Sequence, residues 1–288
     1  MLAVLIAIGS MIYQRSTGPT YPKKINFEIG GNTYSDKLVR SHGGDDPCIV
    51  KILMPDNNVN AILLYHRYKA AEEYDTVVME RITEDGNSYL HAYLPTQPPA
   101  GKLQYFIELY NDNERISIPE KEVVVIRFKG DVPATALIPH VLLMIIAIIL
   151  STLAGILAIA RNKYFRIYTL LTYLSILVGG MILGPIVQKY AFGSYWTGIP
   201  FGWDLTDNKT LFAFLFWNIA LFTNLNKNKP RYIWVWLAAF VWLVIYAIPH
   251  SMFGSELDYE SGKVIQGLIL LLPFGYFKLC EKINSKFN

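Results

Sequence analysis

The hydrophobic positions of this chain follow two different patterns, and the change occurs near Asp131. Between Pro22 and Lys129, apolar and polar residues alternate in short runs, a period of two that is typical of half-buried β-strands. Between residues 132 and 280, the sequence is almost continuously apolar and is broken by short polar loops. We therefore expect an N-terminal segment at 1–19, a β-rich domain at 20–130 and a membrane domain at 131–288.

The β-rich part divides into short strands separated by turn-forming residues. Glycine, asparagine, aspartate and proline gather between the apolar runs, as in Gly30-Gly31-Asn32 and Asp85-Gly86-Asn87. Seven or eight short strands at this spacing, within about 105 residues, indicate an antiparallel β-sandwich. The expected strands are Ile25–Ile29, Thr33–Leu38, Cys48–Met54, Ala61–Tyr68, Thr76–Ile82, Tyr89–Leu94, Leu103–Tyr110 and Glu122–Phe128.

One part of this domain resembles a known fold family. The proline-rich stretch from Leu94 to Gly101, followed by the run Leu103–Tyr110, resembles the late strands of immunoglobulin-like and fibronectin-III-like domains. Tyr105 occupies the place where such domains often have a corner tyrosine. The resemblance covers the soluble third of the chain and implies a sandwich fold, but it implies little about function because this sandwich hosts many roles. The second half resembles uncharacterised bacterial polytopic membrane proteins.

The apolar half contains five runs that we interpret as membrane-spanning helices. A helix needs roughly 20 apolar residues to cross a hydrocarbon core of about 30 Å, and these runs lack the polar face of a soluble helix. The predicted fold class is therefore an α-helical polytopic membrane domain of five spans, with an additional N-terminal anchor, joined to an all-β immunoglobulin-like sandwich outside the membrane. The expected spans are Ala134–Ala160, Ile167–Val187, Thr206–Leu225, Tyr232–Ile248 and Val264–Phe277.

The lysine and arginine residues of the short loops predict an orientation, because cytoplasmic loops carry the excess of basic residues. Nine lie on one side of the five expected spans and three on the other, where acidic residues dilute them. We therefore expect a bacterial inner-membrane protein with a cytoplasmic C-terminus and a periplasmic or extracellular sandwich. The nine are Arg161, Lys163, Arg166, Lys227, Lys229, Arg231, Lys278, Lys282 and Lys286; the three are Lys189, Lys209 and Lys263.

The N-terminal segment allows more than one interpretation. Met1–Tyr13 is apolar but is only about 20 Å long as a helix. It lacks the preceding basic residues of a signal peptide, and Arg15 follows it. We expect an uncleaved anchor with the N-terminus inside. Cleavage near the small residues Ala7 and Gly9, or a start codon further upstream, are the alternatives.

Composition narrows the function classes. Only 17% of the 288 residues are charged, below the roughly 25% of soluble proteins, and the net charge of +3 is not gathered in a patch that would suit nucleic acid. The cysteines Cys48 and Cys280 lie in different regions, so a disulfide between them is not expected. The sequence contains no hydrolase elbow, phosphate loop or zinc-spaced cluster. No acidic or basic residue lies deep in the expected spans, which disfavours a small-molecule transporter.

The most unusual segment is the polar connection at residues 190–209, which we call the aromatic loop. It is dense in aromatic residues, glycines and small polar residues. It could be an interfacial aromatic belt or a surface that binds a partner, with aromatic side chains as a platform and oxygen ligands beside them. The candidate partner-binding residues are Trp196, Phe201, Trp203, Asp204, Asp207, Asn208 and Lys209.

Two histidines form a second constellation. His140 and His250 each follow a proline and each lie at the outer end of an expected span. A pair of histidines on neighbouring helices could ligate haem or copper, although histidines at helix ends more often form interfacial hydrogen bonds. We expect no cofactor, and keep a haem or copper redox subunit, with His140 and His250 as metal ligands, as the alternative function.

The leading hypothesis is a non-catalytic membrane protein, a subunit or assembly factor of an envelope complex. It would bind a membrane or periplasmic protein through the sandwich and the aromatic loop. Its expected partners are the lipid bilayer and other membrane or periplasmic proteins, with no nucleic acid. A small-molecule transporter is the less favoured third hypothesis.

Overall fold

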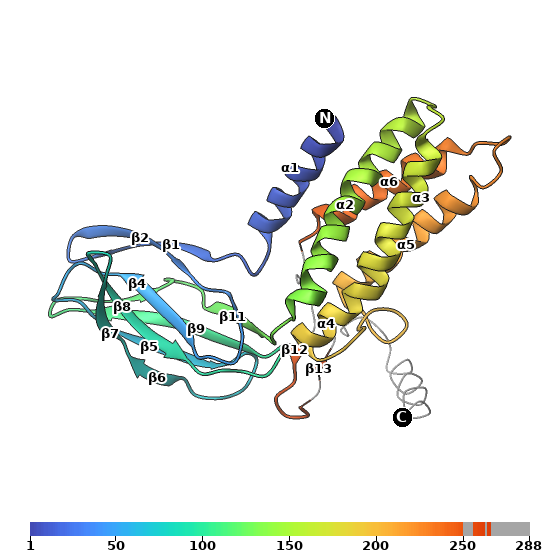
Figure 1. Ribbon diagram of the computed structural model, residues 1–288. Coiled ribbons are helices and arrows are strands. Elements are labelled where there is room, and N and C mark those ends of the chain that lie inside the picture. The colour runs from blue at the N-terminus through green and yellow to red at the C-terminus, as the bar shows by residue number, and fades with distance from the viewer. Residues whose placement is uncertain (250–255, 263, 266–288) are drawn as a thin grey trace. The chain divides into compact units, whose positions relative to one another are not determined.

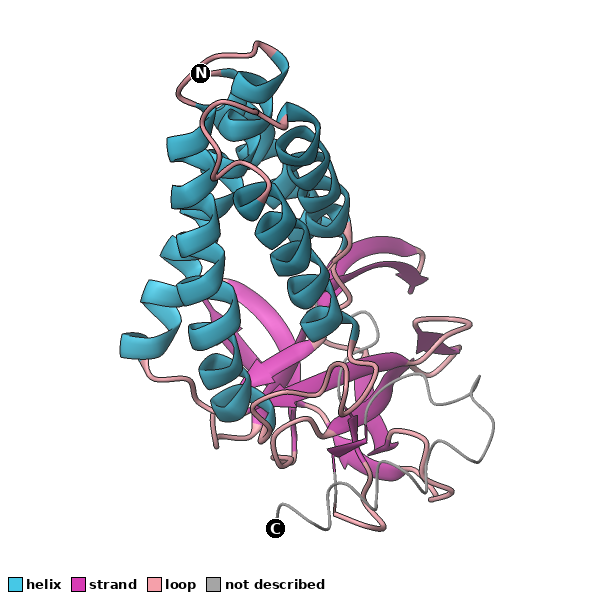
Figure 2. Ribbon diagram, turned by 90° about the vertical axis from the view of Figure 1, so that its right-hand side faces the viewer, coloured by secondary structure: helices cyan, strands magenta, loops and turns pink. Residues whose placement is uncertain are grey.

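The computed structural model describes residues 1–249, 256–262 and 264–265. Contacts divide the chain into two compact units. The helical unit contains Met1–Gly18 and the apolar residues that begin at Val132, and the β-rich unit contains Pro19–Asp131 together with Glu256–Val264. Figure 2 shows the helices in cyan and the strands in magenta. A short segment from late in the sequence is thus part of the β-rich unit.

The β-rich unit contains two larger sheets and two short ribbons. The six-stranded sheet is mixed, because β3 pairs parallel with β11, whereas β9 pairs antiparallel with β11 and β5. Its order is β3 (Ser41–Gly43), β11 (Val124–Lys129), β9 (Lys102–Tyr110), β5 (Asn60–Arg67) and β6 (Asp75–Val78), with β10 (Arg115–Ile118) also on β9. The three-stranded sheet is β4 (Cys48–Leu53), β8 (Asn87–Leu94) and β7 (Glu80–Glu84). The ribbons are β1 (Lys23–Ile29) with β2 (Asn32–Leu38), and β12 (Glu256–Leu257) with β13 (Val264–Ile265).

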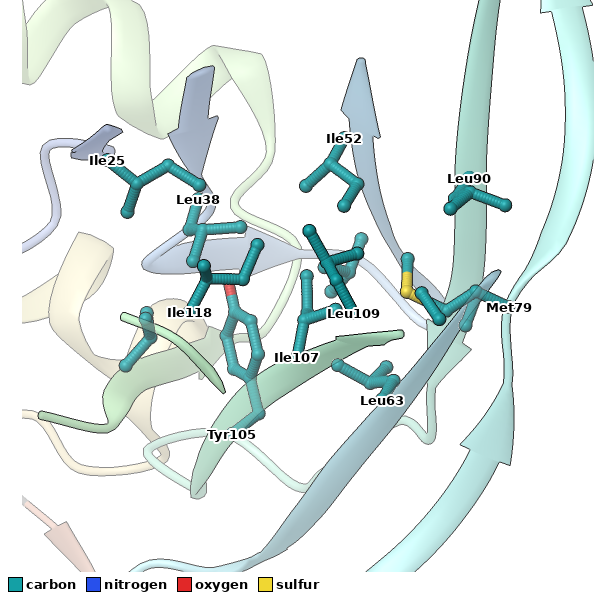
Figure 3. Packing of buried hydrophobic residues seen from close by; sticks show 14 of the residues in the cluster. Ile25, Leu38, Ile52, Leu63, Met79, Leu90, Tyr105, Ile107, Leu109 and Ile118 are labelled. Carbon is teal, nitrogen blue, oxygen red and sulfur yellow. The ribbon is translucent and has the colours of Figure 1, made fainter. Parts of the chain in front are cut away.

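Alternation of apolar and polar residues creates the core of this unit. Along β9, every second residue from Leu103 to Leu109 is buried, because successive strand side chains point to opposite faces. These side chains pack with buried residues from the other strands, as Figure 3 shows. Tyr105 lies among them, fully buried, and its hydroxyl donates a hydrogen bond to the Val39 carbonyl oxygen at 2.8 Å. This bond joins residues 66 positions apart in the sequence, unlike the local bond of a corner tyrosine.

Between Pro19 and Asp131, the strands differ from the expected set in three places. The expected strand Thr76–Ile82 is two strands, β6 and β7, in different sheets. The chain changes sheets at Met79, whose side chain is buried while its N–H donates to the Ala61 carbonyl at 2.9 Å. The short strands β3 and β10 were not expected. Because β3 pairs parallel with β11, the prediction of a purely antiparallel sandwich is wrong.

The helical unit contains five helices among the described residues. They are α1 (Leu2–Thr17), α2 (Ala134–Ile159), the continuous helix Phe165–Phe192, α5 (Leu205–Phe222) and α6 (Tyr232–Ala247). The continuous helix consists of α3 (Phe165–Ser175), the π-helical stretch η1 (Ile176–Leu183) and α4 (Gly184–Phe192). Figure 1 shows α2, α3, α5 and α6 side by side. Gly155 allows α2 to approach α6 closely, since a Cβ there would lie 2.7 Å from Ala239 Cβ.

The prediction of a five-span polytopic membrane domain is wrong. Among the described residues, only α2 and the helix Phe165–Phe192 are long and apolar enough to cross a membrane. The polar first turns of α5 shorten its apolar stretch, and the 16 residues of α6 make only about 24 Å of helix. The expected span Val264–Phe277 begins with the strand β13 and otherwise lies outside the described residues.

The two long helices present apolar side chains to their surroundings. Most residues in their apolar windows are not buried inside the unit. Large exposed side chains include Leu142 and Ile146 on α2 and Leu174 and Ile182 on the second helix. An exposed apolar surface on this scale is unusual for a soluble domain. Both helices therefore suit an apolar environment by length, composition and exposure.

Candidate functional site

The aromatic loop begins where α4 ends and includes the first turns of α5. Gly193 adopts a left-handed conformation with φ of 85°, and its N–H donates to the Lys189 carbonyl, so the helix ends there. Asp204 is the N-cap of α5, and its carboxylate accepts hydrogen bonds from the N–H groups of Thr206 and Asp207. The loop is thus fixed at both ends by helix-capping geometry.

Asp207 forms the centre of a buried polar network beneath the loop. Its Oδ2 accepts hydrogen bonds from the backbone N–H and the hydroxyl of Thr197 and from the Gln188 amide at 3.0 Å. Gln188 also donates to the Thr197 hydroxyl at 2.7 Å. Asp207 and Thr197 are almost fully buried. A buried carboxylate requires such donors, so this network holds the loop against α5 and α4.

A second set of bonds fixes the middle of the loop. Asn208 Oδ1 accepts from the Ile199 N–H at 2.8 Å, and the Trp196 indole N–H donates to the Ile199 carbonyl at 3.0 Å. Gly198 lies against these groups. A Cβ at this position would be 2.7 Å from both Asn208 Oδ1 and Asp207 Cβ, a distance that real Cβ atoms do not adopt. A side chain at this position would therefore force the loop or its neighbours to shift.

Lys209 is also buried, and it interacts with the end of another helix. Its Nζ donates to the carbonyl oxygens of Ile248 and Pro249 at 2.8 and 3.2 Å. Both carbonyls follow the last turn of α6, where a cation is favourable because of the helix dipole. Lys209 therefore links the start of α5 to the end of α6.

Most aromatic side chains of the loop are exposed, in contrast to its buried polar residues. Phe201 is 57% exposed and Trp203 46% exposed, and Tyr195 is similarly open, whereas Trp196 is half-buried. The predicted site residues therefore fall into two groups. Asp204, Asp207, Asn208 and Lys209 are buried in the framework, which the half-buried Trp196 joins through its indole N–H, and Phe201 and Trp203 form the accessible surface. The structure brings these residues together in one loop, and their role in binding stays a prediction.

Several contributors to this site were not recognised in the sequence. Gln188 and Thr197 complete the network around Asp207, but isolated polar residues at these positions carry no pattern that would mark them. Gly198 could have been suspected, since a glycine in a loop can mark a close approach of the backbone to other groups. Tyr195 is part of the exposed aromatic surface, and its ring lies 5.5 Å from Lys189 Nζ.

The histidine pair is only partly described. His140 Nδ1 lies 2.8 Å from the Gly179 carbonyl oxygen in the π-helical stretch, a hydrogen bond between α2 and η1. His250 lies outside the described residues. Within the part of the chain that the structure describes, no three side chains of histidine, cysteine, aspartate or glutamate gather as metal ligands. Haem or copper ligation by His140 and His250 stays a prediction.

Comparison with known proteins adds no family to this description. The resemblance of the β-rich unit to immunoglobulin-like and fibronectin-III-like domains therefore stays a prediction from its strands and turns. No family model matches the chain, and no curated protein sequence is significantly similar to it.

Proposed function

We propose that this chain is a non-catalytic bacterial inner-membrane protein that binds a protein partner through the aromatic loop, as a subunit or assembly factor of an envelope complex. Two crossing helices, α2 and Phe165–Phe192, would form a membrane hairpin. Their length and exposed apolar side chains support this part of the proposal. The hairpin replaces the five spans as the membrane anchor.

The charges at the turn of the hairpin support an orientation. Arg161, Lys163 and Arg166 lie at the connection between the two helices, and basic loops favour the cytoplasmic side. The opposite ends of both helices then face outward. One of these ends follows the β-rich unit in the sequence, and the other continues into the aromatic loop. Under this proposal, both the β-rich unit and the loop would be outside, because the two ends of a hairpin that crosses twice lie on the same side of the membrane.

The observation that carries the binding proposal is the contrast within the loop. The charged side chains are buried and hydrogen-bonded internally, while Phe201, Trp203 and Tyr195 remain exposed. A rigid support lowers the entropic cost of binding, and exposed tryptophan and tyrosine side chains are enriched at binding hot spots. An interfacial belt requires aromatic side chains at the right depth, but it does not require a fixed loop geometry.

The test is to replace both exposed anchors in the full chain, Phe201→Ala with Trp203→Ala, and to purify each variant from native membranes with its associated proteins. We expect a protein that copurifies with the parent chain to be lost from the double variant. Truncation of a buried anchor costs about 2 kcal/mol or more, which is roughly thirtyfold in affinity.

The matched control is Phe222→Ala, at the opposite end of α5, where the side chain is 59% exposed. It should leave the copurifying proteins unchanged. Both variants should reach the membrane in parental amounts, because neither alters the buried framework. An unchanged set of associated proteins in the double variant would refute the binding role of the loop.

A further inference from the structure

The segment 256–262, which we call the latch segment, lies far from the β-rich unit in sequence but is part of it in space. The Leu257 N–H donates to the Ala100 carbonyl oxygen at 3.1 Å. The Tyr259 hydroxyl accepts from the Lys102 N–H at 2.9 Å and donates to the Lys102 carbonyl at 3.0 Å. These bonds use backbone groups at the start of β9, so the latch segment is held partly by main-chain recognition.

Positively charged side chains hold Glu256, the first of the three acidic residues of the latch segment. Glu256 Oε2 lies 2.9 Å from Lys102 Nζ and 3.2 Å from Lys69 Nζ. The Arg67 guanidinium lies 4.9 Å from the centre of the Tyr259 ring, a cation–π distance. Burial lowers the pKa of the Lys102 ammonium, while the hydrogen bond to Glu256 acts to raise it. The carboxylate therefore favours the charged form of a largely buried amine.

The latch segment is also folded by its own hydrogen bonds. The Asp258 carboxylate accepts from the Ser261 hydroxyl at 2.6 Å and from the Glu260 N–H at 3.1 Å. The Gly262 N–H donates to the Asp258 carbonyl at 2.9 Å, with Gly262 at φ of 67°. A turn that is formed in advance loses less entropy when it docks. The segment thus has the features of a short peptide ligand.

We infer that the surface formed by Arg67, Lys69 and Gly101-Lys102 is a binding site for an acidic, tyrosine-containing peptide segment, and that the latch segment is its intramolecular occupant. Three contacts contribute to recognition. The Leu257 N–H bonds to a backbone carbonyl, and the Tyr259 hydroxyl bonds to both the N–H and the carbonyl of Lys102. The Glu256 carboxylate lies between the ammonium groups of Lys69 and Lys102. Gly101 permits the close approach, since a Cβ there would lie 3.0 Å from the Tyr259 hydroxyl. This site shares no residue with the aromatic loop and does not depend on the function proposed for that loop.

An intramolecular occupant competes strongly with an external one. A binding segment that belongs to the same chain as its site can have an effective concentration in the millimolar range. An external peptide of the same sequence should therefore bind weakly while the latch segment is docked. Removing the side chains that hold the latch segment, while the cationic surface remains intact, should make the site available.

The experiment measures binding of a fluorescently labelled peptide, Glu-Leu-Asp-Tyr-Glu-Ser-Gly, to the full chain in detergent. The variant Glu256→Ala with Tyr259→Ala should bind the peptide at least about tenfold more tightly than the parent chain, given an effective concentration of about 1 mM for the latch segment and a dissociation constant of about 0.1 mM or below for the peptide. Adding Lys102→Ala to that variant should remove the gain. Circular dichroism of each variant checks that the β-rich unit is folded.

Two controls separate specific docking from general charge attraction. Glu260→Ala changes an exposed acidic residue of the latch segment that contacts none of the three cations in the described contacts, so it should bind the peptide as the parent does. A peptide with phenylalanine in place of tyrosine should bind the opened variant several-fold less tightly, because it loses both hydrogen bonds to Lys102. Equal affinity of the parent and opened variants, or no binding to the opened variant at about 1 mM peptide, would overturn the inference.

Discussion

The buried thiol of Cys48 links the packing of the β-rich unit to pH. Cys48 is at the start of β4 and is 3% exposed, and burial raises the pKa of its thiol from 9.0 to about 11. The folded chain therefore keeps this proton at a pH where the unfolded chain releases it. The stability that the neutral thiol contributes is present below pH 9 and is lost as the pH rises toward 11.

We predict slow alkylation of Cys48 in the folded chain. With Cys280→Ser, Cys48 is the single remaining cysteine, so iodoacetamide reports on it alone. At pH 9, the folded chain should react at least about fifty times more slowly than the urea-unfolded chain, because about 1% rather than half of the thiol is ionised. The rate should rise as the pH approaches 11. Equal rates at pH 9 would show that the thiol is not shielded.

At the scale of elements, the aromatic loop depends on the absence of a side chain at Gly198. Gly198→Ala would place a Cβ 2.7 Å from two atoms of the framework, so the loop must move and its bonds to Asp207 and Asn208 must weaken. If the folded loop loses about 2 kcal/mol of stability, the population of its open form rises roughly thirtyfold. Hydrogen exchange at the amides of Thr197 and Ile199, measured by mass spectrometry, should accelerate by this order.

The matched control for this substitution is Gly9→Ala on α1. A Cβ there meets nothing within 4 Å, and alanine favours helix over glycine by about 1 kcal/mol. Gly9→Ala should therefore leave exchange in the aromatic loop unchanged and should not destabilise α1. Unaltered exchange in Gly198→Ala would mean that the loop tolerates another arrangement.

The elements also show which features the sequence could predict. Alternation predicted the long strands, such as β5 and β9, because one face of each is buried. It could not predict β3, which has three residues and no alternation of its own, nor the change of sheet at Met79. Length and apolarity predicted α2 and the helix Phe165–Phe192, but they overestimated α5, where Asp207 and Lys209 interrupt the apolar run. In the aromatic loop, the residue types predicted a site. The hydrogen bonds of Gln188 and Thr197 could not be predicted, because they form only when the tertiary structure brings these residues to Asp207.

At the scale of the whole molecule, the chain consists of a β-rich unit and a helical unit, and two of the described helices are long and apolar enough to cross a membrane. Under the proposed orientation, the connection between these helices is cytoplasmic, and the β-rich unit and aromatic loop are outside. The proposal needs only this hairpin. The proposed orientation does not depend on the arrangement of α5 and α6, because the two ends of a hairpin that crosses twice lie on the same side of the membrane.

Labelling of two exposed tyrosine positions tests this arrangement most directly. In the Cys280→Ser chain, Tyr195→Cys places a thiol in the aromatic loop and Tyr164→Cys places one at the basic connection; the parent side chains are 60% and 56% exposed. Spheroplasts are treated with a membrane-impermeant maleimide before and after permeabilisation, and the buried Cys48 serves as the unreactive background. We predict that Tyr195→Cys reacts in intact spheroplasts and that Tyr164→Cys reacts only after permeabilisation. Reversed labelling, equal labelling of both positions in intact spheroplasts, or recovery of the chain in the soluble fraction would contradict the account.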